Sequence, residues 1–306
     1  MWLYFMRRLL FMIPVLLLLS VVVFLVAHLA PGSPVDLIAG PTATQEIRQE
    51  IAAKYGLDQP LPAQYFRWLA NVARADMGRS IVTGRPVLSL ILQRLPATLE
   101  LGLAAWLLAY GLGIPIGIVA AVKQYSLLDN TSIFLAVLGV SIPDFWLSLM
   151  LMLIFAAGLR WFPVGGYGGL SHVVLPAFAL GMGRMAVVAR IVRASMLEVM
   201  SEDYVRTARA KGLVERVVLL SHGFRNALLP LVSLAGLYLG YLVGGAVVVE
   251  TVFARPGVGY LIVKSVAQRD FPVVQGAVLV LGMSVLTFNL ITDIAYAIID
   301  PRIRYG

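Results

Sequence analysis

Two opposite charges lie inside long apolar runs of this sequence. Asp144 directly follows Pro143 in one run, and Arg184 lies midway along the next. A lone charge at the centre of a bilayer is costly, by several kcal/mol on insertion scales. The two runs are expected to be antiparallel neighbours, and counting residues places both charges at a similar depth. Either one or both line a translocation path and contact a zwitterionic or chelate substrate, or they form a structural ion pair between adjacent helices.

Other common kinds of site have no signal in the sequence. There is no cysteine, which excludes thiol catalysis, disulfides and thiolate metal sites within this chain. His28, His172 and His222 fall on different elements without paired-ligand spacing, so we expect no metal site. No Gly-x-x-x-x-Gly-Lys-Ser/Thr phosphate loop and no nucleophile elbow are present. We therefore expect a chain that is not an enzyme by itself and binds no cofactor.

The segment 201–230 is polar and basic and separates two apolar runs. Its pattern predicts two helical stretches broken at Gly212, with Pro230 opening the next apolar run. Such a segment cannot lie in hydrocarbon, so it must be exposed to water, where it could dock onto another protein. Gly212 would allow the sharp chain reversal that other residues resist. The basic side chains either pair with carboxylates of that partner or are solvated: Arg206, Arg209 and Lys211.

The composition is that of an integral membrane protein. Of 306 residues, 60% are hydrophobic and 13% are charged, whereas soluble domains carry about 25% charged residues. We expect an all-α fold with six transmembrane helices, because six apolar runs come near the ~20 residues that a bilayer requires. The first run is longer than the ~7–15 residues of a signal-peptide core, so we expect it to be uncleaved. The runs are 9–30, 97–122, 133–157, 173–194, 227–249 and 273–299.

Lysine and arginine gather on one side of these spans. Arg7 and Arg8 precede the first span, Lys123 follows the second, several arginines flank 201–230, and Arg302 and Arg304 follow the last. By the positive-inside rule, both termini and the 201–230 segment are cytoplasmic. This pattern accounts for the net charge of +8, and no basic, aromatic platform for nucleic acid is visible. Glu100 and Asp293 lie nearer span ends, where snorkelling or helix pairing is expected.

The connection 31–96 would lie on the opposite side of the membrane. It is too polar to span, and residues 45–55 and 64–75 are patterned as short amphipathic helices. We expect a small extracytoplasmic helical cap, with further outer loops at 158–169 and 250–271. The expected organisation is a first helix at 1–30, a cap at 31–96 and a five-helix core at 97–306 that includes a loop at 197–226.

Two stretches of the 201–230 segment carry a family resemblance. Tyr-Val-Arg-Thr-Ala-Arg-Ala-Lys-Gly-Leu at 204–213 and Arg-Asn-Ala-Leu-Leu-Pro at 225–230 resemble the coupling loop of bacterial ABC-importer permeases of the dipeptide, oligopeptide and nickel subfamily. Arg206 stands where the general family pattern has glutamate, and the spacing from Gly212 to Pro230 is longer. Both departures resemble the peptide/nickel branch. Similar motifs recur along the chain, at 31–34, 56–61, 95–101, 141–143, 250–259, 269–275 and 300–304.

The resemblance implies a permease subunit of an ATP-driven importer in the bacterial inner membrane. This subunit would form half of a pathway for di- or oligopeptides, with nickel, a metal chelate or glutathione as alternatives. A second homologous permease, two ATP-binding subunits that carry ATP and Mg, and an extracytoplasmic binding protein are the implied partners. The cap would contact the binding protein through Gln64, Arg67 and Trp68. The ATPase-coupling residues would be Glu202, Asp203, Tyr204, Arg206, Thr207, Ala208, Arg209, Ala210, Lys211, Gly212 and Leu213.

A self-sufficient secondary transporter is the alternative of another class. It would require inverted repeats, broken helices and coupling-ion sites, and the sequence shows no such symmetry. An intramembrane enzyme is a further alternative, but no catalytic constellation is visible. Co-purification of an ATPase would separate the importer from both.

Overall fold

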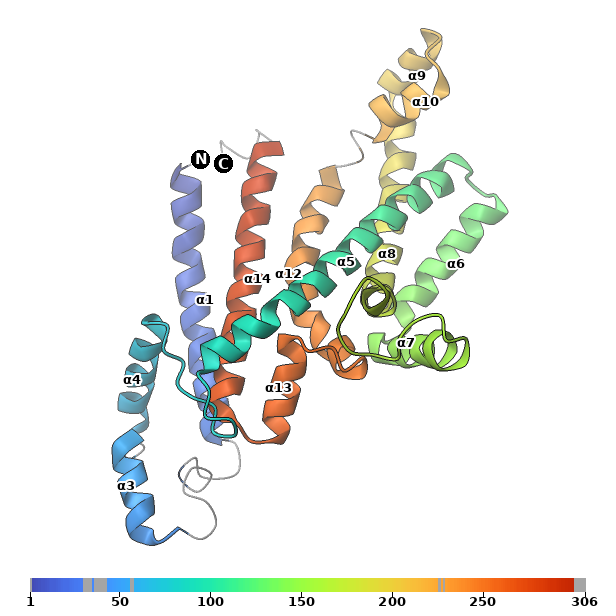
Figure 1. Ribbon diagram of the computed structural model, residues 1–306. Coiled ribbons are helices and arrows are strands. Elements are labelled where there is room, and N and C mark those ends of the chain that lie inside the picture. Colours follow the sequence, from blue (N-terminus) through green and yellow to red (C-terminus); the bar gives the residue numbers. More distant parts are fainter. Residues whose placement is uncertain are drawn as a thin grey trace. The chain divides into compact units, whose positions relative to one another are not determined.

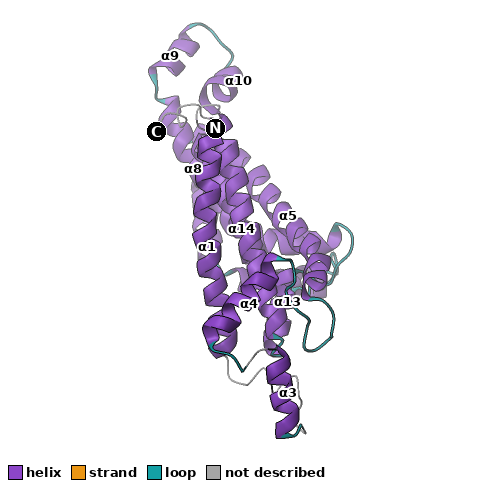
Figure 2. Ribbon diagram, turned by 90° about the vertical axis from the view of Figure 1, so that its left-hand side faces the viewer, coloured by secondary structure: helices purple, strands orange, loops and turns teal. Residues whose placement is uncertain are grey.

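The computed structural model describes residues 2–29, 35, 43–55, 58–224, 227 and 229–299. The predicted features at 31–34, 56–57, 225–226 and 300–304 lie outside these residues. The chain divides into two compact units, one made of Trp2–Ala97 and Pro256–Ser284, the other of Thr98–Arg255 and Val285–Gly306. Apart from one isolated β-bridge between Arg79 and Pro86, the regular structure in the described ranges is helical (Figures 1 and 2).

The long helices confirm the expected all-α membrane fold. Four of them, of 24 to 36 residues, are apolar and long enough to cross a membrane, and the count reaches six when each of two bent pairs forms one span. All exceed or reach the ~20 residues that a bilayer requires. The long helices are α1 (Trp2–Leu29), α5 (Val87–Val122), α8 (Ser171–Met200), α12 (Leu229–Val252) and α14 (Phe271–Ile299).

The third predicted span, 133–157, is not a straight helix. It consists of α6 (Leu127–Ser141) and α7 (Asp144–Leu151), the latter continued by the π-helical η1 (Met152–Gly158). The chain bends by 105° between the two arms. Ile142 is extended, with φ −84° and ψ 122°, as expected for a residue that precedes a proline. Asp144 therefore lies near the middle of this bent span, at the elbow where α7 begins.

Glycines bring α5 and α8 into backbone contact within the second unit. A Cβ atom on Gly117 would lie 2.5 Å from the carbonyl oxygen of Ala189, and one on Gly113 would lie 2.9 Å from that of Met185. Small residues are the usual means by which membrane helices approach closely. Elsewhere in this unit, buried side chains of α5, α7, α8 and α12 form a core cluster, among them Leu101, Leu147, Leu180 and Val249.

This contact predicts a difference between two glycines of the same helix. Gly117→Ala is expected to lower the yield of folded protein, since overpacking costs about 1–3 kcal/mol. Gly111→Ala is the matched control, because nothing lies within 4 Å of a Cβ at that position. Size-exclusion chromatography of the two variants in detergent measures the effect. Equal monodisperse yields would contradict the close packing of α5 on α8.

The first unit contains the short helices of the cap. Helix α3 (Gln45–Tyr55) has the predicted bounds, whereas α4 (Leu61–Ala73) begins earlier than the predicted 64–75, because Pro62 occupies its first turn. α4 packs on α1 through Tyr65, whose hydroxyl lies 2.8 Å from that of Ser20. The predicted outer loop 250–271 contains a helix that the sequence did not indicate, α13 (Val258–Ala267).

Candidate functional site

The segment after α8 folds as two short helices around a left-handed glycine. Helix α9 (Asp203–Ala210) is followed by Gly212 with φ +75°, then by α10 (Glu215–Val217) and the π-helical η2 (Val218–Phe224). Asp203 in the first turn of α9 is favourable to the helix dipole. The predicted order of helix, glycine break and second helix is confirmed.

One face of α9 is anchored on the end of α8. Val205 and Ala208, three positions apart and therefore on one side of the helix, are buried together with Val218. Val199 and Met200 of α8 pack against this cluster. The remaining side chains of α9 are exposed. The 203–224 segment therefore packs on α8 through one buried side, formed by Val205, Ala208 and Val218. Its other side is exposed.

The free face carries several large apolar side chains. Val214 is 70% exposed, and Tyr204, Leu213, Val217 and Leu220 are between 41% and 46% exposed. Large exposed apolar side chains gathered in one short segment are typical of a protein interaction site. We refer to these five residues as the apolar face of the loop.

Two of the three predicted partner-facing cations have partners within the loop. Arg209 and Glu215 lie on opposite sides of Gly212 in the chain, and Nη2 of Arg209 donates to Oε1 of Glu215 at 2.8 Å. The Nη1 of Arg206 lies 3.3 Å from Oδ1 of Asp203. The hydrogen bond from Arg209 lowers the pKa of Glu215 below its ordinary value. The pair is therefore formed at neutral pH and lost as the pH falls through that lowered pKa. Lys211 has no ion pair with any residue that the structure describes.

Asp144 and Arg184 meet, as their predicted depths required. The Nη1 of Arg184 donates to Oδ2 of Asp144 at 3.2 Å and also to the carbonyl of Leu180. The side chains are 17% exposed for Arg184 and 34% exposed for Asp144. Gly245 of α12 leaves room for the guanidinium, because a Cβ there would lie 3.1 Å from Nη2. The pair thus lies where α7, α8 and α12 come together, and both side chains are partly exposed.

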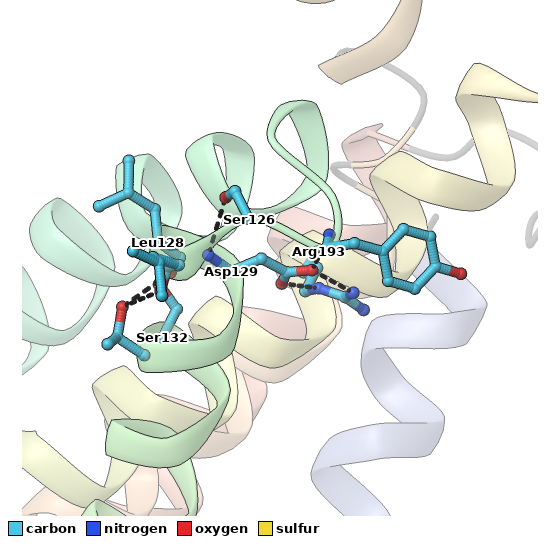
Figure 3. A network of polar contacts seen from close by, with 8 residues as sticks. Ser126, Leu128, Asp129, Ser132 and Arg193 are labelled. Carbon is cyan, nitrogen blue, oxygen red and sulfur yellow. Dashed lines mark hydrogen bonds and ion pairs between the residues drawn. The ribbon is translucent and has the colours of Figure 1, made fainter.

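A second ion pair fastens the start of α6 to α8. Arg193 donates to Asp129 through Nε at 2.6 Å and Nη2 at 2.8 Å, and the Asp129 side chain is 1% exposed (Figure 3). The backbone N–H of Tyr125 also donates to this carboxylate, and Ser126 caps the helix by accepting from the N–H of Asp129. In the sequence, Arg193 is one of the arginines that flank 201–230 and indicate orientation. An arginine within an apolar helix is itself a sign of a carboxylate partner.

A buried arginine pairs with one of the carboxylates expected near a span end. Arg255 is fully buried, donates to Glu100 at 2.7 Å and lies 4.9 Å from the ring centroid of Tyr167. Nearby in the chain, the buried Glu250 accepts from the Thr98 hydroxyl at 2.6 Å. Helix pairing was expected for Glu100, and the structure assigns its partner to the turn that follows α12.

The three residues predicted to contact a binding protein do not share one environment. Gln64 lies 3.2 Å from Nε2 of His28 on α1, and the Trp68 ring lies 5.7 Å from that of Phe24. Arg67 is exposed, as is the neighbouring Phe66. Two of the three therefore face α1, and Arg67 faces away from it. Across the described residues, no three His, Asp or Glu side chains gather as a metal site would require.

Comparisons with known proteins place the whole chain in one family. The family described as "Binding-protein-dependent transport system inner membrane component" matches residues 113–305, and the N-terminal region of the corresponding membrane components matches residues 1–102. The chain is 43% identical to the oligopeptide transport system permease protein AppB of Bacillus subtilis (strain 168) over 99% of both chains. It is 44% identical to the glutathione transport system permease protein GsiC of Escherichia coli (strain K12), again over 99% of both.

A solved structure shares the fold. A chain of the inward-facing MetNI methionine ABC transporter aligns with 70% of this chain and 97% of its own length, with a TM-score of 0.59 and 18% identity. The match supports a permease fold, and the apolar helices make the protein a multi-pass membrane protein. Because the family match covers nearly the entire sequence, the chain belongs to the binding-protein-dependent transport system inner membrane components, the permeases of ABC importers.

Proposed function

We propose that this permease forms half of the translocation pathway of an ATP-driven importer for di- and oligopeptides, with glutathione in the same substrate class. A second homologous permease would complete the pathway. Two ATPase subunits would bind ATP and Mg, and an extracytoplasmic binding protein would deliver the substrate. Both termini and the 203–224 segment would be cytoplasmic. Nickel or a metal chelate is the alternative cargo.

The 203–224 segment is the observation that carries this proposal. A part that transmits force from an ATPase must be seated on a transmembrane helix and present a free surface. The Val205–Ala208–Val218 base meets the first requirement, since it packs on the end of α8. The apolar face of the loop, with Lys211 beside it, meets the second. In this proposal the exposed residues of the predicted coupling segment, Glu202 to Leu213 without the buried Val205 and Ala208, border the ATPase.

The Asp144–Arg184 pair supports a substrate with opposite charges. A carboxylate and a guanidinium joined by one 3.2 Å contact and partly exposed offer partners for an ammonium and a carboxylate group. Peptides carry both. The relatives AppB and GsiC are named for oligopeptide and glutathione transport, and both of these substrates fit that description. The pair would then line the path, at the elbow between α6 and α7.

Purification through a tag on this chain, after co-expression with the other subunits, tests the proposal. We expect a complex that contains two permeases and two ATPases by mass determination. In proteoliposomes with ATP inside and the binding protein outside, labelled peptides or glutathione should enter, and nickel should not. A monomer that transports without ATP would support the secondary transporter instead.

The cap predicts a position-dependent crosslink. Benzoylphenylalanine in place of Arg67, which is exposed, is expected to capture the binding protein under illumination. The same label in place of Gln64 should react within the chain, since Gln64 contacts His28 of α1. Gel analysis of crosslinked membranes measures both. Lipid adducts alone at position 67 would exclude this surface as the docking site.

A further inference from the structure

A groove lies among α5, α6 and α8 that the proposed transport pathway does not use. It has a volume of about 270 Å³ and is lined by residues of all three helices. Its floor is made of small side chains, including Gly117, Ala136 and Ala189, whereas Ile133 and Val137 on its rim are exposed. The groove is therefore open to the surroundings of the protein.

The groove is apolar along most of its length. Apolar walls offer water few hydrogen-bond partners, and enclosed apolar cavities stay dry for this reason. Within a bilayer, lipid acyl chains would occupy such a groove. The exposed α6 side chains on its rim, Ile133, Val137 and Val140, are also those that would face lipid tails.

One end of the groove is positively charged. Arg190 and Arg193 both line it, but they differ in charge balance. Arg193 is neutralised by its two hydrogen bonds to Asp129. Arg190 is exposed and forms no ion pair with any residue in the described ranges. The groove thus carries one uncompensated guanidinium beside an apolar channel.

The position of Arg190 along α8 suits the boundary of the hydrocarbon. α8 has 30 residues, a length of about 45 Å, against a hydrocarbon thickness of ~30 Å. With Ser171 at the outer boundary, Arg190 lies about 29 Å along the helix. The charged end of the groove would then meet lipid phosphates on the side of the 203–224 segment.

We propose that this groove binds an anionic phospholipid of the cytoplasmic leaflet, with an acyl chain along α5 and α6 and the phosphate on Arg190. The chemistry is complementary, since guanidinium groups bind phosphate through paired N–H donors. Basic pockets between transmembrane helices on the cytoplasmic side are known to hold anionic head groups. The inference rests on the orientation given under the proposed function.

Photocrosslinking of the complete importer complex tests the proposal. The complex is placed in nanodiscs of phosphatidylcholine and phosphatidylglycerol, with benzoylphenylalanine in place of Val137. Leu135, which is exposed on α6 but does not line the groove, is the matched label position. One basic residue near a membrane surface is worth ~1 kcal/mol, so phosphatidylglycerol adducts at 137 should exceed the bulk ratio about fivefold. Adducts at 135 should follow the bulk ratio.

Substitutions assign the enrichment to the guanidinium. Arg190→Gln is expected to return the ratio at 137 to the bulk value, and Arg190→Lys to retain most of the enrichment. Arg216→Gln, which removes an exposed charge outside the groove, should leave the ratio unchanged. Ala136→Leu fills part of the groove and should reduce adducts of both lipids, which tests the site even where Arg190→Gln fails to fold.

Three results would overturn the lipid site. They are a bulk ratio at 137, an enrichment unaffected by Arg190→Gln, and adducts with the second permease in place of lipid. ATP-driven uptake is measured on the same preparations. Enrichment without uptake would count against the proposed function alone, and uptake without enrichment would count against the lipid site alone.

Discussion

Gly212→Val is expected to reduce ATP-driven uptake by roughly 5- to 30-fold while the protein remains in the membrane. Gly212 has φ +75°, where a side chain costs roughly 1–2 kcal/mol, and a β-branched residue is a strong outlier there. Nothing lies within 4 Å of a Cβ at this position. The cost of the valine therefore arises from the backbone conformation and not from a steric clash. A cost of this size would disrupt the chain reversal between α9 and α10.

Asparagine provides the control for this experiment. It visits the left-handed region more readily than valine does, so Gly212→Asn should keep most of the uptake. Substrate-stimulated ATP hydrolysis and uptake in proteoliposomes are the measurements for both variants. Normal values for Gly212→Val would refute the assignment of this segment as the coupling element.

Asp144→Asn and Arg184→Gln are each expected to impair assembly, and the double variant to recover it. Each single change leaves a partly buried charge without its partner, at a cost of roughly 1–3 kcal/mol. When both charges are removed, no unpaired charge remains. A double-mutant cycle on complex yield isolates the interaction between the two side chains.

Uptake decides what the pair does. Recovery of assembly without recovery of uptake would place both residues on the substrate path, whereas recovery of both would make the pair structural. Strictly additive losses for Asp144 and Arg184 in both assays would contradict their contact.

Local signals in the sequence were sufficient for α3 and for the break at Gly212, and insufficient for α13 and for the bends. The bounds of α3 were predicted because they follow from amphipathic pattern alone. α5 begins at Val87 and not at residue 97, because Pro96 does not end the helix and prolines are tolerated in membrane helices. At Pro143, by contrast, the helix is interrupted and the chain bends. Tertiary packing decides between the two outcomes, so sequence alone does not separate them.

Some ion pairs could likewise be predicted from the sequence, and others could not. The Asp144–Arg184 contact could be predicted, because neighbouring antiparallel helices fix relative depth through a constant rise per residue. The Asp129–Arg193 pair was missed, because Asp129 lies outside the predicted span 133–157 while α6 begins at Leu127. Arg255 and Glu100 are 155 positions apart in the chain, and no pattern of the sequence links that turn to α5.

The elbow between α6 and α7 limits what can border this subunit inside the membrane. α6 has 15 residues, a rise of about 22 Å, so it turns before a ~30 Å hydrocarbon layer is crossed. At the turn, Ser141 and Pro143 are exposed, and Ile142 is extended. Lipid tails provide no hydrogen-bond partners for irregular backbone. At that depth such backbone is found only where it contacts protein or water. Lipid tails are therefore excluded from this corner. The elbow must be covered either by water or by a neighbouring protein subunit.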